Sequence, residues 1–160
     1  MKHKVTLSRY SVFLSASVLI VFLVWLYHSD ESWLIMIIGL LILVGLVLAF
    51  YYMPLYVSVN EKELCVNRSL CSTKIPFLEI DDIHLTQPTM GERNLGGSYG
   101  WFGHWGWFSE RDLGKYFAYY GKTSDCFLVK LKDGRQYMLG CDNPDDIVAY
   151  IRHRLGYSSL

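Results

Sequence analysis

Two apolar stretches near the start of the chain decide its fold: VFLSASVLIVFLVWLY at residues 12–27 and WLIMIIGLLILVGLVLAFYYM at residues 33–53. Neither stretch contains a charged residue, and a short polar loop separates them. At about 1.5 Å per residue, the second stretch forms a helix of roughly 31 Å, close to the hydrocarbon thickness of a bilayer, about 30 Å. The first stretch is shorter, so it needs Ser11 and His28 at its ends, or a slightly thinner bilayer, to cross the membrane. We therefore predict a membrane anchor, residues 1–53, with two transmembrane helices at about 11–28 and 33–53.

The charges that flank the two stretches predict the topology. Lys2, Lys4 and Arg9 precede the first stretch, whereas the loop between the stretches carries Asp30 and Glu31 and no Lys or Arg. Because basic flanking residues are retained in the cytoplasm, we expect the N-terminus on that side. Two spans return the chain to the same side. The sequence thus predicts a multi-pass protein of the cell membrane whose C-terminal domain is also cytoplasmic.

A cleaved signal peptide is the alternative for the first stretch, since a basic start followed by an apolar core fits that pattern too. After the apolar core, however, come Trp25, Leu26, Tyr27 and His28. These residues include no pair of small side chains at the spacing that a signal peptidase needs. We therefore favour the anchor.

Small residues lie near the predicted cytoplasmic ends of both helices. Ser11 and Ser15 share one face of the first helix, and Gly45 and Ala49 form a small-xxx-small pair on the second. Since the helices are antiparallel, the two faces lie at a similar depth. A close helix contact there is one interpretation, and the chance occurrence of small residues in an apolar helix is the other.

The rest of the chain, residues 54–160, is long enough for one small domain with its own core. It carries twelve Lys and Arg against thirteen Asp and Glu, a formal charge of −1. This balance argues against binding to nucleic acid. All four cysteines lie in this part of the chain. In a reducing cytosol they would remain thiols.

Short runs rich in aromatic and β-branched residues, bounded by turn formers, predict about seven strands in this domain. The segment 88–114 shows neither a helical period nor an alternation of two, so we expect a long loop there. The predicted strands are residues 55–59, 64–68, 73–77, 83–87, 115–120, 126–132 and 135–139.

A helix with clear end signals closes the domain. Asn143 suits the N-cap, Pro144 suits the first helical position, and Gly156 can end the helix. Ile147, Val148, Ile151 and Leu155 form an apolar stripe at helical spacing. We therefore expect this helix to pack on the strands through that stripe.

This order of elements, and several local segments, resemble a bacterial family of pleckstrin-homology-like (PH-like) domains. The resemblance covers about residues 55–155. It implies an α+β fold, in which a bent antiparallel sheet or barrel of about seven strands is capped by a C-terminal helix, and a membrane-tethered protein without a defined reaction. The similar segments are TKIPF at 73–77 followed by Glu79 and Ile80, LGKY at 113–116, DGRQY at 133–137 and NPDD at 143–146.

The same resemblance argues against one ligand. PH domains that bind phosphoinositides do so with basic residues in the first hairpin. Here the turn of the first hairpin carries Glu61, Lys62 and Glu63. We therefore do not predict specific phosphoinositide binding.

Four consecutive Gly-x-aromatic triplets, GSYGWFGHWGWF at residues 97–108, are the most unusual local feature. The glycine spacing does not fit a dinucleotide-binding loop, and no cofactor is expected. Trp and Tyr are favoured at a membrane interface, so one interpretation is a site that contacts the membrane or a partner. The other is that the rings cap the core of the domain. The residues of this hypothetical site are Tyr99, Trp101, Phe102, Trp105, Trp107 and Phe108.

No motif in the domain indicates a metal site or a catalytic site. Cys65 and Cys71 are separated by five residues and Cys126 and Cys141 by fourteen, which is not the close spacing of zinc ligands. No nucleophile has a neighbouring base motif. We therefore predict no catalytic, cofactor-binding or metal-binding residues.

Together these features predict a membrane-anchored, non-enzymatic binding or scaffold module. The expected partners of its cytoplasmic PH-like domain, residues 54–160, are the lipid bilayer and a membrane or cytoplasmic protein. The alternative is an enzyme or a metal-dependent sensor whose site assembles from distant residues.

Overall fold

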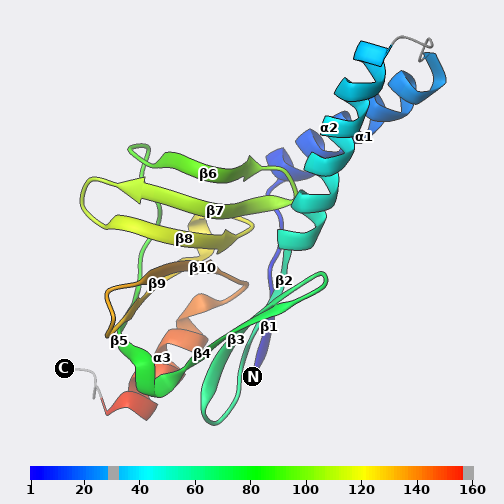
Figure 1. Cartoon of the computed structure of the whole chain (residues 1–160). Coiled ribbons are helices and arrows are strands. Elements are labelled where there is room, and N and C mark those ends of the chain that lie inside the picture. Colours follow the sequence, from blue (N-terminus) through cyan, green and yellow to red (C-terminus); the bar gives the residue numbers. More distant parts are fainter. Residues whose placement is uncertain (29–32, 157–160) are drawn as a thin grey trace.

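The computed structural model describes residues 1–28 and 33–156 of the chain. Two apolar helices project from a domain built of two sheets and one further helix (Figure 1). The elements are β1 (Lys2–Lys4), α1 (Arg9–His28), α2 (Trp33–Tyr52), β2 (Pro54–Val59), β3 (Glu63–Arg68), β4 (Ser72–Pro76), η1 (Phe77–Glu79), β5 (Ile80–Leu85), β6 (Arg93–Gly100), β7 (Gly103–Glu110), β8 (Gly114–Tyr120), η2 (Thr123–Asp125), β9 (Cys126–Leu131), β10 (Gln136–Gly140) and α3 (Pro144–Leu155).

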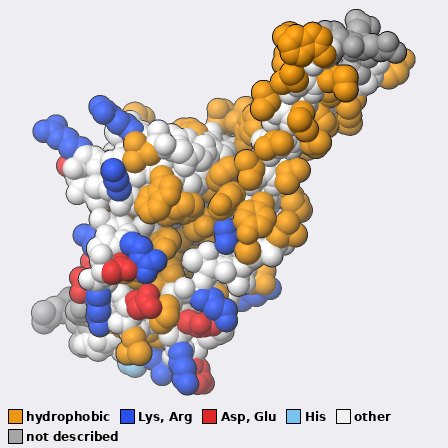
Figure 2. Space-filling model, in the orientation of Figure 1, with side chains coloured by type: hydrophobic (Ala, Val, Ile, Leu, Met, Phe, Trp, Pro, Cys, Tyr) orange, Lys and Arg blue, Asp and Glu red, His pale blue; other side chains and the backbone are white. Residues whose placement is uncertain are grey.

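The helices α1 and α2 agree closely with the two predicted spans. Each has 20 residues and is long and apolar enough to cross a membrane. Few of their side chains are buried in the structure, and apolar side chains cover their surface (Figure 2). The predicted outer loop with Asp30 and Glu31 lies outside the described residues.

The strands form two sheets. Sheet A has the order β1-β2-β3-β4 and is antiparallel throughout. Sheet B has the order β5-β9-β10-β8-β7-β6, in which only the β8–β10 pair is parallel. The short helix η1 connects the two sheets. In the described chain no strand of one sheet pairs with a strand of the other, so the two sheets do not close into a barrel.

All seven predicted strands are confirmed, and the structure adds three. Two of them, β6 and β7, occupy most of the segment that we expected to be a loop, so that prediction is wrong. The glycines explain the error, because one at every third position hides the alternation of two that marks a strand. Gly97 lies opposite Gly106 in the ladder, and a Cβ on Gly97 would be 2.7 Å from the Cα of Gly106. Only a residue without a side chain allows the strands to approach so closely.

The third added strand, β1, lies before α1 in the chain, where no strand was expected. It pairs with β2, which follows α2, so the two ends of the helical pair are joined in one sheet. The buried side chain of Val5 continues this strand into the main core. Residues on both sides of the helical pair therefore belong to sheet A.

The apolar stripe of α3 packs as predicted. Ile147, Val148 and Ile151 are buried, and Leu155 is half-buried. Gly156 ends the helix with a left-handed φ of 78°, and its N–H is directed at the carbonyls of the last turn. Asn143 is the N-cap residue as predicted, but it has a left-handed φ of 54° and its side chain makes no capping hydrogen bond.

Sheet B separates two cores. Its α3 face, which carries Phe127, Val129 and Leu139, packs against α3 and sheet A. Its loop face carries a second cluster, over which the connection between β5 and β6, residues 86–92, is fastened by side-chain hydrogen bonds. The residues of the second cluster are Phe108, Tyr116, Ala118, Tyr120, Cys126, Leu128 and Met138.

Candidate functional site

The aromatic hairpin, β6 and β7 with the turn between them, holds the residues of the predicted site. Its turn is fixed by Ser98, whose Oγ accepts a hydrogen bond from the Trp101 N–H (2.8 Å) and donates one to the Trp101 carbonyl (3.1 Å). Phe102 has a φ of 52°, which a bulky residue adopts only when its surroundings hold it. Gly100 and Gly103 flank this position, with φ of 120° and 102°. The sequence therefore builds a tight turn that presents two large rings.

This turn docks on the apolar helices. The backbone N–H of Phe102 donates a hydrogen bond to Ser15 Oγ in α1 (2.9 Å), and Ser15 Oγ donates to the Ser11 carbonyl (2.7 Å). In α2, a Cβ on Gly45 would be 3.4 Å from the Trp101 ring. Ser15 and Gly45 belong to the small faces expected to join the helices to each other. In the structure, both receive the turn of the aromatic hairpin.

The end of α2 is held by aromatic rings of the domain. Trp105 stacks on Tyr52 with a ring-centroid distance of 4.9 Å, and its Nε1–H donates to the Trp101 carbonyl (3.1 Å). The Arg68 guanidinium lies over the rings of Tyr51, Tyr52 and Tyr119 at 5.3 to 5.5 Å. Stacking and cation–π contacts of this kind stabilise the joint between α2 and the domain.

A groove of about 330 Å³ lies between the aromatic hairpin and the two helices. Leu14, Gly45 and Leu48 line it from the helices, and Trp101 and Trp105 from the hairpin. It opens beside apolar helix surface. The groove fits an apolar group better than a charged one.

The predicted site residues separate into three environments. Tyr99 and Trp107 are about half exposed, at 52% and 47%. Trp101, Phe102 and Trp105 are partly buried near the helices. Phe108 is fully buried in the second cluster. Because Phe108 contributes to the core, it is not a surface residue, and its inclusion in the predicted site is corrected.

A cluster of acidic, histidine and tyrosine side chains beneath residues 86–92 was not expected from the sequence. The Glu92 carboxylate accepts hydrogen bonds from Tyr116 Oη (2.5 Å) and Tyr120 Oη (3.0 Å). Buried His104 stacks on the Tyr120 ring with a centroid distance of 4.6 Å. Buried Glu110 accepts hydrogen bonds from the backbone N–H and the side chain of Thr89. These residues come from three segments, the connection at 86–92, β7 and β8, so no local motif could reveal the cluster.

Burial sets the protonation of this cluster. It raises the pKa of Glu92, which its tyrosine hydrogen bonds oppose. Burial also raises the pKa of Tyr116 and Tyr120 far above the ordinary tyrosine value. It lowers the pKa of His104 to about 4. At neutral pH both tyrosines are therefore hydrogen-bond donors and His104 is uncharged, which suits a structural latch that holds residues 86–92 in place.

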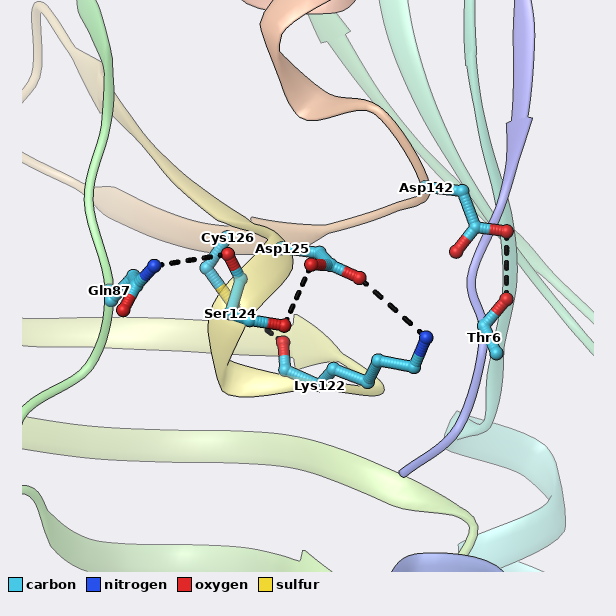
Figure 3. Close-up of polar contacts among 7 residues, drawn as sticks. All are labelled: Thr6, Gln87, Lys122, Ser124, Asp125, Cys126 and Asp142. Carbon is cyan, nitrogen blue, oxygen red and sulfur yellow. Dashed lines mark hydrogen bonds and ion pairs between the residues drawn. The ribbon is translucent and has the colours of Figure 1, made fainter. Parts of the chain in front are cut away.

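The segment before α1 is locked into a polar junction (Figure 3). Thr6 Oγ1 donates to Asp142 Oδ2 (2.7 Å), and the Asp142 N–H donates to the Lys4 carbonyl (2.8 Å). In the neighbouring connection Lys122 pairs with Asp125 (3.8 Å), and the Cys126 thiol is directed at the Lys122 carbonyl (3.1 Å). The contacts of Lys4 and Thr6 with Asp142 tie the segment before α1 to the domain.

The cysteines in the described chain are free, as expected. Burial raises the pKa of Cys126, and it raises that of Cys141 to about 12, so both remain protonated thiols at neutral pH. Within residues 1–28 and 33–156, no group of three or more His, Cys, Asp or Glu side chains is arranged to hold a metal ion. Metal binding therefore has no candidate ligand set in this part of the chain.

Comparison with known proteins agrees with the resemblance stated above. No curated protein and no solved structure matches the chain. The bacterial PH domain family matches residues 55–155, which include every strand from β2 onward and all of α3. The chain therefore belongs to the bacterial PH domain family.

Proposed function

We propose that this chain is a membrane-anchored, non-enzymatic binding module. In this proposal α1 and α2 cross the bilayer and hold the PH-like domain at its cytoplasmic surface, where the domain binds a protein partner. The observation that carries it is the docking of the aromatic turn on the helices, through the hydrogen bond from Phe102 to Ser15 and the contact of Trp101 with Gly45. This contact gives the domain a fixed orientation relative to the membrane.

The pairing of β1 with β2 supports the predicted topology. The two strands lie on either side of the helical pair in the chain and can pair only if both are on the same side of the membrane. Two spans satisfy this condition. Together with the basic residues before α1, it supports a cytoplasmic domain.

The depth of the aromatic turn supports contact with the bilayer. Gly45 precedes Tyr52, the last residue of α2, by seven positions, or about 10 Å along the helix. The Trp101 ring lies beside Gly45 and so reaches past the end of α2 toward the membrane. Trp is favoured at the interface between headgroups and hydrocarbon. We infer that Trp101 and Phe102 occupy this interface.

The first hairpin lies far from the proposed bilayer. β2 leaves the end of α2 and runs for six residues, which places the turn with Glu61, Lys62 and Glu63 about 20 Å away. Neither its charge nor its position favours binding to membrane phosphoinositides.

Quenching by brominated lipids tests the proposal. Each variant of the full chain keeps one tryptophan, with the others changed to Phe, and is reconstituted in bilayers. Trp101 should be quenched most, Trp105 less and Trp107 least, because Trp101 lies in the turn beside the helices and the other two follow at increasing distance along β7. A variant that keeps only Trp25 is the control, since this residue lies within α1. Absence of quenching for Trp101 in bilayers that quench Trp25 would remove the interfacial site.

A reporter fused after Leu160 tests the topology. A reporter that is active only in the periplasm should remain inactive, and a cytoplasmic reporter should be active. The opposite pattern would overturn the cytoplasmic placement of the domain.

The cluster around Glu92 is the observation that favours an enzyme or a sensor, because acid and base groups gather there. Its tyrosines are fully buried and donate hydrogen bonds to Glu92, which favours the structural latch. Elemental analysis of the purified full chain tests the metal-dependent alternative, and a stoichiometric bound metal would favour that alternative over our proposal.

A further inference from the structure

Part of the α3 face of sheet B is only partly covered in the described chain. A row of rings crosses three adjacent strands there: Trp107 lies opposite Phe117, and Phe117 opposite Tyr137. The rings of Trp107 and Phe117 meet edge to face, with centroids 5.1 Å apart. Trp107 is 47% exposed, and Phe117 and Tyr137 are partly exposed. The same face is fully buried at Phe127 and Val129, where α3 and sheet A pack on it.

A basic row lies directly beside the aromatic row. Arg93 lies opposite Ser109, and Ser109 opposite Lys115, so both cations share the α3 face with Trp107 and Phe117. Arg111 lies exposed in the turn between β7 and β8. Across residues 1–28 and 33–156, no carboxylate lies within ion-pair distance of these three cations, although other lysines and arginines form such pairs. Asp112 is the one acidic residue in the same turn, so the patch has an excess of positive charge.

We propose that this surface, defined by Arg93, Trp107, Arg111, Lys115, Phe117 and Tyr137, binds an extended acidic segment of a protein partner. Exposed rings supply area at a low cost in side-chain entropy, and Arg and aromatic residues are the types enriched where binding energy concentrates. The adjacent cations are complementary to carboxylates that alternate with apolar side chains. The proposal rests on the proposed function, and it names the partner of that binding module by its chemistry.

Position separates this surface from the membrane contact. Ser109 follows Gly103 by six residues in β7, so the basic row is about 20 Å from the end of the strand that meets the helices. The domain as a whole is slightly acidic, which argues against nucleic acid as the ligand. The aromatic turn thus faces the bilayer, and the surface at the other end of the hairpin faces the cytoplasm.

The probe for this surface is a random copolymer of glutamate and tyrosine, titrated against the full chain in zwitterionic nanodiscs. Polyglutamate alone should bind more weakly, because it lacks the rings. Lys115→Glu should weaken binding of the copolymer by about tenfold, since it replaces an attraction by a repulsion. Trp107→Ala should weaken it to a similar degree. The matched control, Lys62→Glu, makes the same charge change in the turn of the first hairpin and should change the affinity by less than about twofold.

Equal effects of Lys115→Glu and Lys62→Glu, or no binding of the copolymer, would overturn the proposal. So would quenching of Trp107 by brominated anionic lipids, which would assign the surface to the bilayer. None of these three results changes the expected quenching of Trp101, so this inference can fail while the proposed function holds. Failure of Trp101 quenching, with binding that still depends on Lys115, would remove the membrane orientation and retain the peptide site.

Discussion

The two faces of sheet B invert the usual distribution of side chains at the strands β6 to β8. On the loop face Glu110 and His104 are buried and Glu92 is half-buried above them, whereas on the α3 face the Trp107 ring is about half exposed and the Phe117 ring is partly exposed. Buried polar groups require hydrogen bonds, and most of those on the loop face have them. The exposed rings of the α3 face lie next to cations that form no ion pair in the described chain, and the fold gives no reason for this arrangement. In our proposal the loop face serves stability and the partly exposed region of the α3 face serves binding.

The largest expected effect comes from removing the cover of the α3 face. Ile151 is fully buried between α3 and the sheet, so Ile151→Ala should lower the free energy of unfolding by about 2 to 5 kcal/mol. His153, exposed on the same helix, is the control, and His153→Ala should change it by less than about 0.5 kcal/mol. Thermal unfolding of the full chain in detergent, followed by near-UV circular dichroism, measures both. An unchanged Tm for Ile151→Ala would mean that α3 does not hold this face closed.

Removing the latch of the loop face should have a somewhat smaller effect. Glu92→Ala leaves the buried hydroxyls of Tyr116 and Tyr120 without their acceptor, which should cost about 2 to 4 kcal/mol. Glu92→Gln retains an acceptor, so its cost should be nearer 1 kcal/mol. Urea unfolding monitored by tyrosine and tryptophan fluorescence distinguishes the two variants. If both cost the same, the carboxylate would not be the group that fastens residues 86–92.

The pH dependence of stability should also report the loop face. His104 has its pKa lowered to about 4 by burial, whereas the unfolded chain has the ordinary value of 6.5. As the pH falls below about 6.5, the unfolded state therefore binds protons that the folded state does not, and stability is lost until about pH 4. Between pH 7 and about 4.5 the contribution of His104 should be about 2 kcal/mol.

His104→Phe should remove this part of the pH dependence. The difference between the parent chain and the variant isolates His104 from Glu92, whose raised pKa acts in the opposite direction. Two parallel stability curves over this range would show that His104 does not remain neutral and buried.

The smallest effect on stability is expected on the partly exposed region of the α3 face. Lys115→Gln should change the free energy of unfolding by less than about 0.5 kcal/mol, because the side chain is exposed and forms no ion pair in the described chain. Differential scanning calorimetry measures this change. A loss greater than about 1 kcal/mol would mean that the basic row supports the fold and is not free to bind.

Sequence patterns predicted the elements that carry a clear apolar run, an alternation of apolar residues or a helical apolar spacing. The two apolar helices, seven strands and the stripe of α3 fall in this class, and they include β9, which is recognisable from its aromatic and β-branched residues although both its faces are buried. The pattern failed at β6 and β7, where glycines replace the residues that would alternate. It also failed at β1, which is short and polar and is recognisable only from its partner β2, distant in the sequence.

The residues of the candidate site could be predicted from the sequence, but the face of the sheet that each one occupies could not. The Gly-x-aromatic triplets drew attention to Trp101, Trp105 and Trp107, but not to the face each occupies. The face of the sheet that each side chain occupies depends on the register of β7 with β8. This register places Trp107 beside Phe117, and Phe108 is buried on the other side. The basic row depends on the same register, since Arg93 and Lys115 are 22 residues apart in the sequence.

The position of β1 has a consequence for biosynthesis. The ribosome makes this strand before α1 and α2, and its partner β2 emerges only after both apolar helices have been translated. Until then β1 and the apolar side chain of Val5 have no sheet to join. In the proposed topology, insertion of α1 and α2 must therefore return the chain to the compartment that holds β1 before sheet A can form. In a nascent chain stalled between α1 and α2, β1 would remain unpaired and open to a chaperone or a protease.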